Sequence, residues 1–165
     1  MIDKKTYLQK NQKGFSILEL ILVMLVAAII FARVSLDIQQ SSQDAKSANV
    51  AHALVADLRY AQELAITSSR SITFSITPTN YNARWSDDNT LIGRAGVTGA
   101  APVNETITDG TTIVNHLGGS LQFDIWGSPS VGGVAISSGS DRQVASVGGI
   151  KTIMIVPSTG YLYMQ

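Results

Sequence analysis

The sequence predicts an α+β protein in which one long N-terminal helix packs on a C-terminal antiparallel β-sheet domain. Residues 15–67 contain neither proline nor glycine, and apolar side chains recur at helical spacing in the second half of that stretch. From residue 68 onward, short β-branched runs alternate with turns rich in Gly, Pro, Ser and Asn, which is typical of strands. The chain has 165 residues, which fits a single domain, and 45% of them are apolar, which is enough for a core.

The first fourteen residues form a short, polar and basic segment. Residues 1–14 carry four lysines against one aspartate, whereas the rest of the chain carries 8 basic and 11 acidic side chains. The segment ends at Gly14, and the next 18 residues, Phe15–Ala32, contain Glu19 as their one charged side chain. A secretory signal peptide places its small-residue cleavage site after the apolar run, so this order of segments differs from such a signal.

Residues 15–33 have the length and composition of a membrane-spanning helix. An 18-residue helix rises about 27 Å, close to the roughly 30 Å of a bilayer core. Lysines before the span are expected to stay in the cytoplasm, which places the chain after the span in the periplasm or outside the cell. Arg33 follows the apolar run and is expected to anchor it at the interface, with its aliphatic stem in lipid.

Residues 34–67 are expected to continue the helix as an amphipathic segment, for a total of about 50 residues and about 75 Å. The stretch Asp37–Asn49 is polar and is predicted to be exposed. Beyond it, one face is apolar and is expected to face a core, whereas the opposite face is polar or small. The apolar face consists of Val50, Leu54, Leu58, Ala61 and Ala65, and the opposite face of His52, Ala56, Arg59 and Glu63.

Residues 68–165 are predicted to form the sheet domain. Asp87–Asp109 lacks periodicity and is predicted to be a long loop. The predicted strands are Ser71–Thr77, Tyr81–Trp85, Thr111–Asn115, Leu121–Ile125, Gly133–Ser137, Lys151–Val156 and Gly160–Met164.

The stretch Lys13–Leu20 resembles the N-terminal signature of type IV pilins. It holds, in order, a basic residue, a glycine, an aromatic residue and a glutamate four residues later, all before an unbroken apolar helix. The resemblance implies that a prepilin peptidase removes the leader, residues 1–14, by cutting between Gly14 and Phe15, and that Phe15 is then N-methylated. Because Gly14 has no side chain, an extended backbone could lie close to the peptidase site.

Glu19 is the candidate assembly residue. A carboxylate within a spanning helix costs roughly 2.5–3.5 kcal/mol on insertion, which makes it a functional hypothesis. One interpretation is that Glu19, four residues from the new terminus, is partly solvated at the cytoplasmic interface. The other is that it pairs with the α-ammonium of Phe15 on a neighbouring subunit and sets the register of assembly. The pilin resemblance supports the second interpretation.

Later segments resemble the H-type minor pseudopilins of type II secretion and their relatives, the FimT/FimU-type minor pilins. The matching segments are Val55–Ile66 leading into Ser71–Phe74, then Leu121–Gly127 and Ile153–Tyr161, whereas the loop Asp87–Asp109 is unmatched. The chain lacks cysteine and has no proline before Pro78, unlike many major pilins.

This resemblance implies a minor pseudopilin, a structural subunit that waits in the bacterial inner membrane and then joins a pseudopilus that supports protein secretion. The implied partners are other pseudopilins or pilins, the prepilin peptidase, an inner-membrane assembly platform and, before assembly, membrane lipid. The alternative is a minor pilin of a type IV pilus, acting in pilus initiation, adhesion or DNA uptake.

Other chemistry has little support in the sequence. The absence of cysteine excludes disulfides and thiolate sites. A Ser–His–Asp triad could be drawn from His116, Asp124 and a serine, but no G-x-S-x-G pattern surrounds any serine. We therefore expect a structural protein without cofactor or metal and not an enzyme; a membrane-anchored periplasmic enzyme is the alternative from another class.

Three smaller sets of residues complete the analysis. Asp87, Asp88 and Asn89 could supply oxygen ligands to Ca²⁺, although a hydrated turn is the more common role, so a calcium site stays open. Trp85 and Trp126 flank strands and are expected to pack in the core or on the domain surface. The net charge is zero and Lys151 is the one basic residue among the last fifteen, so no nucleic-acid partner is expected.

Overall fold

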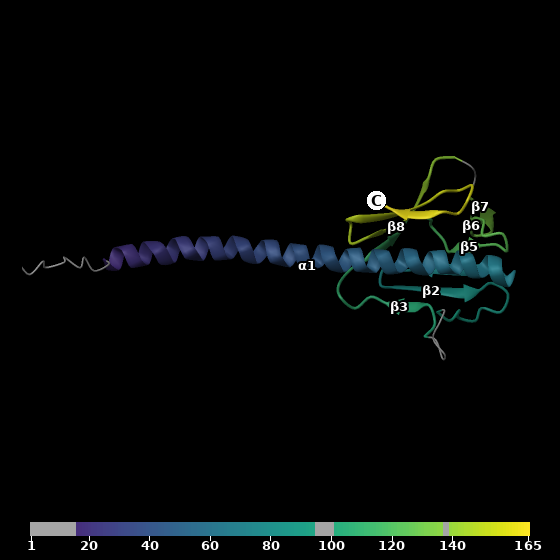
Figure 1. Ribbon diagram of the computed structural model, residues 1–165, viewed down its shortest axis with the longest axis horizontal. Coiled ribbons are helices and arrows are strands. Elements are labelled where there is room, and N and C mark those ends of the chain that lie inside the picture. The colour runs from purple at the N-terminus through teal and green to yellow at the C-terminus, as the bar shows by residue number, and fades with distance from the viewer. Residues whose placement is uncertain (1–15, 95–100, 137–138) are drawn as a thin grey trace, which may run out of the picture. The chain divides into compact units, whose positions relative to one another are not determined.

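The computed structural model describes residues 16–94, 101–136 and 139–165, except for the side chains of residues 34–38. Within these residues, helix α1, Ile17–Ser68, precedes ten strands, which confirms the predicted α+β class (Figure 1). The chain divides into two compact units, Met1–Gln40 and Ser41–Gln165, so α1 contributes to both.

In the first unit, α1 begins at a serine cap and presents apolar side chains to its surroundings. The backbone N–H of Leu18 donates to Ser16 Oγ at 3.4 Å, which satisfies one of the free donors of the first turn. Side chains from Ser16 to Arg33 are exposed. Among the described residues, no helical stretch is both long and apolar enough to count as a membrane span.

In the second unit, the predicted amphipathic pattern of α1 is confirmed. Leu54, Leu58, Ala61 and Ala65 are fully buried, and Val50 packs against the same core while half-buried. The predicted polar face, His52, Ala56, Arg59 and Glu63, is exposed. The prediction that the polar stretch Asp37–Asn49 is exposed holds for residues 39–46 and for Asn49, but it was wrong for Ser47, which is fully buried, and for Ala48, which is half-buried.

The strands form two antiparallel sheets. One has six strands in the order β3-β2-β1-β5-β6-β7, and the other has four in the order β10-β9-β8-β4. The six-stranded sheet consists of β1 (Ile72–Ile76), β2 (Asn80–Trp85), β3 (Asn104–Thr106), β5 (Leu121–Phe123), β6 (Pro129–Val131) and β7 (Val134–Ala135). The four-stranded sheet consists of β4 (Ile113–Asn115), β8 (Arg142–Val147), β9 (Lys151–Ile155) and β10 (Leu162–Met164).

The core lies where α1 meets both sheets. Alternate residues of β1, Ile72, Phe74 and Ile76, point into it, and the ring of Phe74 stacks on that of Tyr81 from β2 with 5.7 Å between centroids. Ile153 and Ile155 of β9 contribute the facing side chains from the other sheet. In Figure 1, β2 and β3 are drawn on one side of the second half of α1 and the C-terminal strands on the other.

The predicted strands exist within a few residues of their predicted bounds, but three others were missed. The predicted loop Asp87–Asp109 was wrong in part, because it contains β3 and two isolated bridges, Arg84 to Leu91 and Gly93 to Pro102. Strands β6 and β8 were also missed. β6 has three residues and starts at a proline, and β8 is polar at its start and carries a bulge between Gln143 and Ala145, so neither shows a regular alternation.

The turn between β8 and β9 packs closely against α1 at Gly148. Gly148 has a φ of 60°, and a Cβ built there would overlap Ser47 Oγ and lie 2.8 Å from Ser47 Cβ. Gly149 has a φ of 70°, but a Cβ built there would have no neighbour within 4 Å. The helix can therefore approach the four-stranded sheet here because position 148 has no side chain.

We expect Gly148→Ala to lower the free energy of unfolding by about 2–4 kcal/mol, through backbone strain and overlap with Ser47. Gly149→Ala shares the strain without the overlap and should cost only about 1–2 kcal/mol. Denaturant titration of both variants provides the measurement. If both variants lost the same free energy of unfolding, the close approach of Ser47 to position 148 would not contribute to the effect.

Candidate functional site

The predicted processing site lies at the edge of the described chain. Gly14 and Phe15 fall outside the described residues, so the cleavage and methylation positions stay predictions. Ser16 is the first described residue, and its carbonyl accepts the backbone N–H of Leu20 at 3.1 Å. Helix α1 thus begins within two residues of the predicted cut.

Glu19 lies in the first turn of α1 and is exposed. A negative charge there interacts favourably with the positive end of the helix dipole. Ser16 and Glu19 also have the spacing of a capping box, in which the glutamate reaches back to the serine N–H. Helix capping is therefore a third possible role for Glu19 that the sequence analysis did not consider.

Large apolar side chains surround Glu19 along the first unit of α1. From Ile17 to Phe31 they are well exposed, between 47% for Val26 and 79% for Ile17. Soluble monomers rarely expose contiguous apolar surface of this kind, and such surface marks contact with membrane or protein. Lipid and the apolar faces of other helices are both suitable neighbours.

In the domain, the buried carboxylate of Asp57 on α1 belongs to a network of hydrogen bonds and ion pairs with residues from three other segments. Asp57 is only 9% exposed, and its Oδ2 accepts hydrogen bonds from Tyr81 Oη at 3.0 Å and Arg94 Nη2 at 2.7 Å. Arg94 Nη2 also contacts Glu105 Oε2 at 3.2 Å. Burial, together with the charge of Asp57, raises the pKa of the Tyr81 hydroxyl, and the hydrogen bond to Asp57 raises the pKa of Arg94. The network of these four side chains therefore connects α1 to β2, to β3 and to the segment that ends at Arg94.

Asp57 was not predicted as a site, although its position in the sequence carries a signal. Asp57 lies three residues after Leu54 and four before Ala61, so helical spacing places it on the apolar face. A carboxylate on a buried face requires a partner, which predicts a buried network. The partners themselves are not identifiable from spacing, because Arg94 and Glu105 lie in the segment predicted to be a loop.

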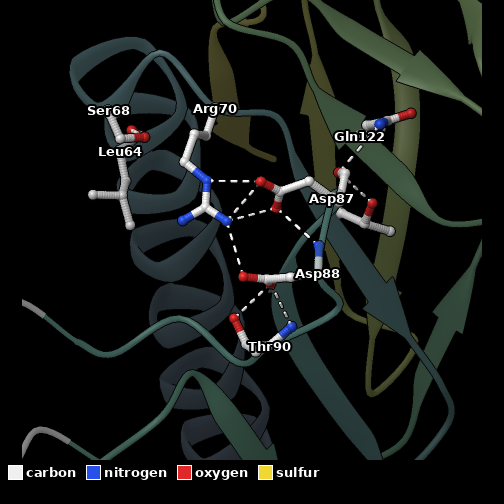
Figure 2. A network of polar contacts seen from close by, with 9 residues as sticks. Leu64, Ser68, Arg70, Asp87, Asp88, Thr90 and Gln122 are labelled. Carbon is white, nitrogen blue, oxygen red and sulfur yellow. Dashed lines mark hydrogen bonds and ion pairs between the residues drawn. The ribbon is translucent and has the colours of Figure 1, made fainter.

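A second network, which is exposed, connects the residues after the C-terminal end of α1 with those after β2 (Figure 2). Arg70 forms ion pairs with Asp87 at 2.6 Å and Asp88 at 3.0 Å, and its guanidinium lies 4.2 Å from the centre of the Trp85 ring. The hydrogen bond from Arg70 holds the pKa of Asp87 below its ordinary value, and the hydrogen bond from the Thr90 hydroxyl does so for Asp88. These two carboxylates, suggested as calcium ligands, are therefore occupied by Arg70, and no group of three or more metal-ligating side chains occurs in the described part of the chain.

The residues of the hypothetical triad have other partners. His116 Nε2 lies 3.0 Å from Ser146 Oγ, whereas Asp124 Oδ1 accepts the backbone N–H groups of Trp126 and Ser128, both at 2.8 Å. The turn that Asp124 stabilises presents Trp126 to solvent with 79% of its surface exposed. His52 lies on the exposed face of α1, as predicted.

Two known family models match the chain, one over the domain and one over the N-terminal segment. The family described as type II transport protein GspH matches residues 50–149, which is more than half of the chain. The prokaryotic N-terminal methylation motif matches residues 9–32, a range that includes Gly14, Phe15 and Glu19. No curated protein and no solved structure matches the chain. The chain is therefore a pilin-like protein that belongs to the GspH family of type II transport proteins.

Proposed function

We propose that the protein is a minor pseudopilin, a structural subunit of the pseudopilus of a type II secretion system. The observation that carries the proposal is the combination, in one chain, of a methylation motif over residues 9–32 and a GspH-family domain over residues 50–149. The role is structural and not enzymatic: the subunit contributes a helix and a domain to a fibre.

The chain would begin as a single-pass protein of the bacterial inner membrane, with residues 1–14 in the cytoplasm and the domain in the periplasm. The prepilin peptidase would cut after Gly14 and methylate Phe15. The exposed apolar side chains of Ile17–Phe31 would be covered first by lipid and later by helices of other subunits. Both environments remove apolar surface from water, so transfer from lipid to the fibre requires little change in burial. An inner-membrane assembly platform would carry out this transfer.

A deletion strain tests the secretion role. We expect loss of extracellular enzymes from the medium and their accumulation in the periplasm, restored by the wild-type gene on a plasmid. Surface pilus number should be unchanged. Normal export with reduced pilus number would instead support the alternative, a minor pilin of a type IV pilus.

Substitution of Glu19 tests the assembly step. Glu19→Leu should insert in the membrane and be processed but fail to join the fibre, because no carboxylate is left to pair with the α-ammonium of a neighbour. Chemical cross-linking to other subunits in membranes and in sheared fibres measures incorporation.

Glu19→Gln is the matched variant, since glutamine retains the capping-box geometry and loses the charge. Failure of both variants supports charge pairing. Normal incorporation of Glu19→Gln would mean that capping, and not charge, is what Glu19 supplies.

A further inference from the structure

A cavity of about 470 Å³ lies in the domain between α1 and the segment that begins in β3 and continues to Asp109. Its size lies within the roughly 300–1,000 Å³ typical of ligand sites. The wall on α1 includes Ala53, whose short, exposed side chain leaves the space open.

Part of the lining of the cavity is apolar. Val50 on α1 and Ile107 after β3 both line it, and both are half-buried against the hydrophobic core. Their side chains are held by that core, so this part of the cavity is largely formed before any ligand arrives. An aliphatic chain fits such a surface.

The rim of the cavity is rich in hydrogen-bond acceptors and is acidic. The charge of Asp57 is already neutralised by Arg94, but Glu105 uses only Oε2 in its contact with that guanidinium; its Oε1 has no hydrogen bond or ion pair within the described residues. Asp109 is exposed, and the backbone N–H of Thr111 donates to its Oδ1 at 2.9 Å. That hydrogen bond, with a smaller contribution from the charge of Lys46, holds the pKa of Asp109 below its ordinary value, so the carboxylate is ionised at neutral pH.

The complementary ligand has an aliphatic stem and a cationic end. Anions are disfavoured by the two carboxylates, and a purely apolar ligand would leave the second oxygen of Glu105 and the exposed carboxylate of Asp109 without a cationic partner from the ligand. We propose that the cavity binds an arginine or lysine side chain of a partner polypeptide, with the stem against Val50 and Ile107 and the charge between the carboxylates of Glu105 and Asp109.

A polypeptide is favoured over a free amine because the cavity adjoins β3, which lies at the edge of the six-stranded sheet among the described residues. β3 is the outermost strand of the six-stranded sheet, and its three residues are exposed. An extended segment could pair with the outward backbone groups of β3 while one basic side chain enters the cavity. The proposal needs only the folded domain, so it stands independently of the secretion role.

The test is titration of the isotope-labelled full chain in non-ionic detergent, followed by NMR. The probes are the peptide acetyl-Gly-Arg-Gly-amide, its glutamate counterpart and agmatine. We expect the arginine peptide to shift the amide signals of Thr106 and Thr108, with a Kd in the millimolar range, and the glutamate peptide to shift neither. Agmatine, which has the cation without the backbone, should bind no more tightly than the arginine peptide.

Three variants test whether the arginine peptide binds in this cavity. Glu105→Gln should raise the Kd of the arginine peptide about tenfold through loss of a charged hydrogen bond. Ala53→Leu should raise the Kd by narrowing the cavity without changing its charge, while Glu63→Gln, which alters an exposed carboxylate on α1 outside the cavity, should leave the Kd unchanged. Spectra that are unchanged away from the cavity show that each variant is folded.

Three results would overturn the proposal. They are equal shifts with the arginine and glutamate peptides, an unchanged Kd in a folded Ala53→Leu variant, and binding of agmatine without binding of the peptide. The last would identify a site for free amines and not for a partner polypeptide. None of them bears on secretion in a deletion strain, so failure here is distinguishable from failure of the proposed function.

Discussion

Gly14→Val is expected to block removal of the leader, so that the protein accumulates in the membrane as a form longer by the 14 residues of the leader. A β-branched side chain at this position would prevent the close approach of an extended backbone to the peptidase. The methylation motif matches residues 9–32 and therefore includes this position. Immunoblotting and mass measurement of membrane fractions distinguish the two forms.

Gln12→Val is the matched control for this experiment. It introduces the same side chain into the leader two residues before Gly14, and we expect the leader to be removed as in the wild type. Complete processing of Gly14→Val would contradict the proposed cleavage site. A block in both variants would show that the peptidase recognises more of the leader than Gly14.

Asp57→Ala is expected to lower the free energy of unfolding of the domain by about 2–4 kcal/mol, mostly because a buried hydroxyl loses its acceptor and to a smaller extent because a partly exposed ion pair is lost. The variant leaves the hydroxyl of Tyr81, a fully buried residue, without its acceptor, and it leaves Arg94 without its 2.7 Å partner. It also removes the ion pair between α1 and the segment that carries Arg94, although the hydrogen bond from Tyr60 Oη to the carbonyl of Gly93 at 2.8 Å remains. Denaturant titration of the full chain in detergent, followed by circular dichroism of the sheet, gives the measurement.

Two further variants separate burial from charge. Asp57→Asn keeps the shape and an acceptor for Tyr81 and should lose less stability than Asp57→Ala. Arg70→Ala breaks the exposed ion pairs with Asp87 and Asp88, and because water screens these charges, it should have a clearly smaller effect than Asp57→Ala. If Asp57→Ala were no more damaging than Arg70→Ala, the Asp57 network would not be the main polar link between helix and sheets.

The helix was predictable from the sequence because its signals are local and repeated. Neither proline nor glycine interrupts residues 15–67, and the apolar face from Leu54 to Ala65 repeats at helical spacing. The strands β1 and β2 were predictable for a similar reason, since each alternates buried and half-buried residues. Patterns of this kind are imposed by the hydrophobic core and can be read without knowing the tertiary structure.

The remaining features depend on contacts between distant residues. β3 has no buried side chain and exists because Asn104–Thr106 pairs with β2, more than twenty residues earlier. The partners of Asp57 are equally distant in sequence, with Arg94 37 residues away. Local periodicity carries no information about such pairings, so the partners of Asp57 and the cavity beside them became apparent only in the fold.

The processing and methylation of the N-terminus can be measured directly by mass spectrometry of the native protein from its own membranes. The prepilin assignment predicts a mature chain that begins at Phe15 and carries one methyl group on its α-amino nitrogen. A chain that retains Met1, or that starts at any residue other than Phe15, would contradict it.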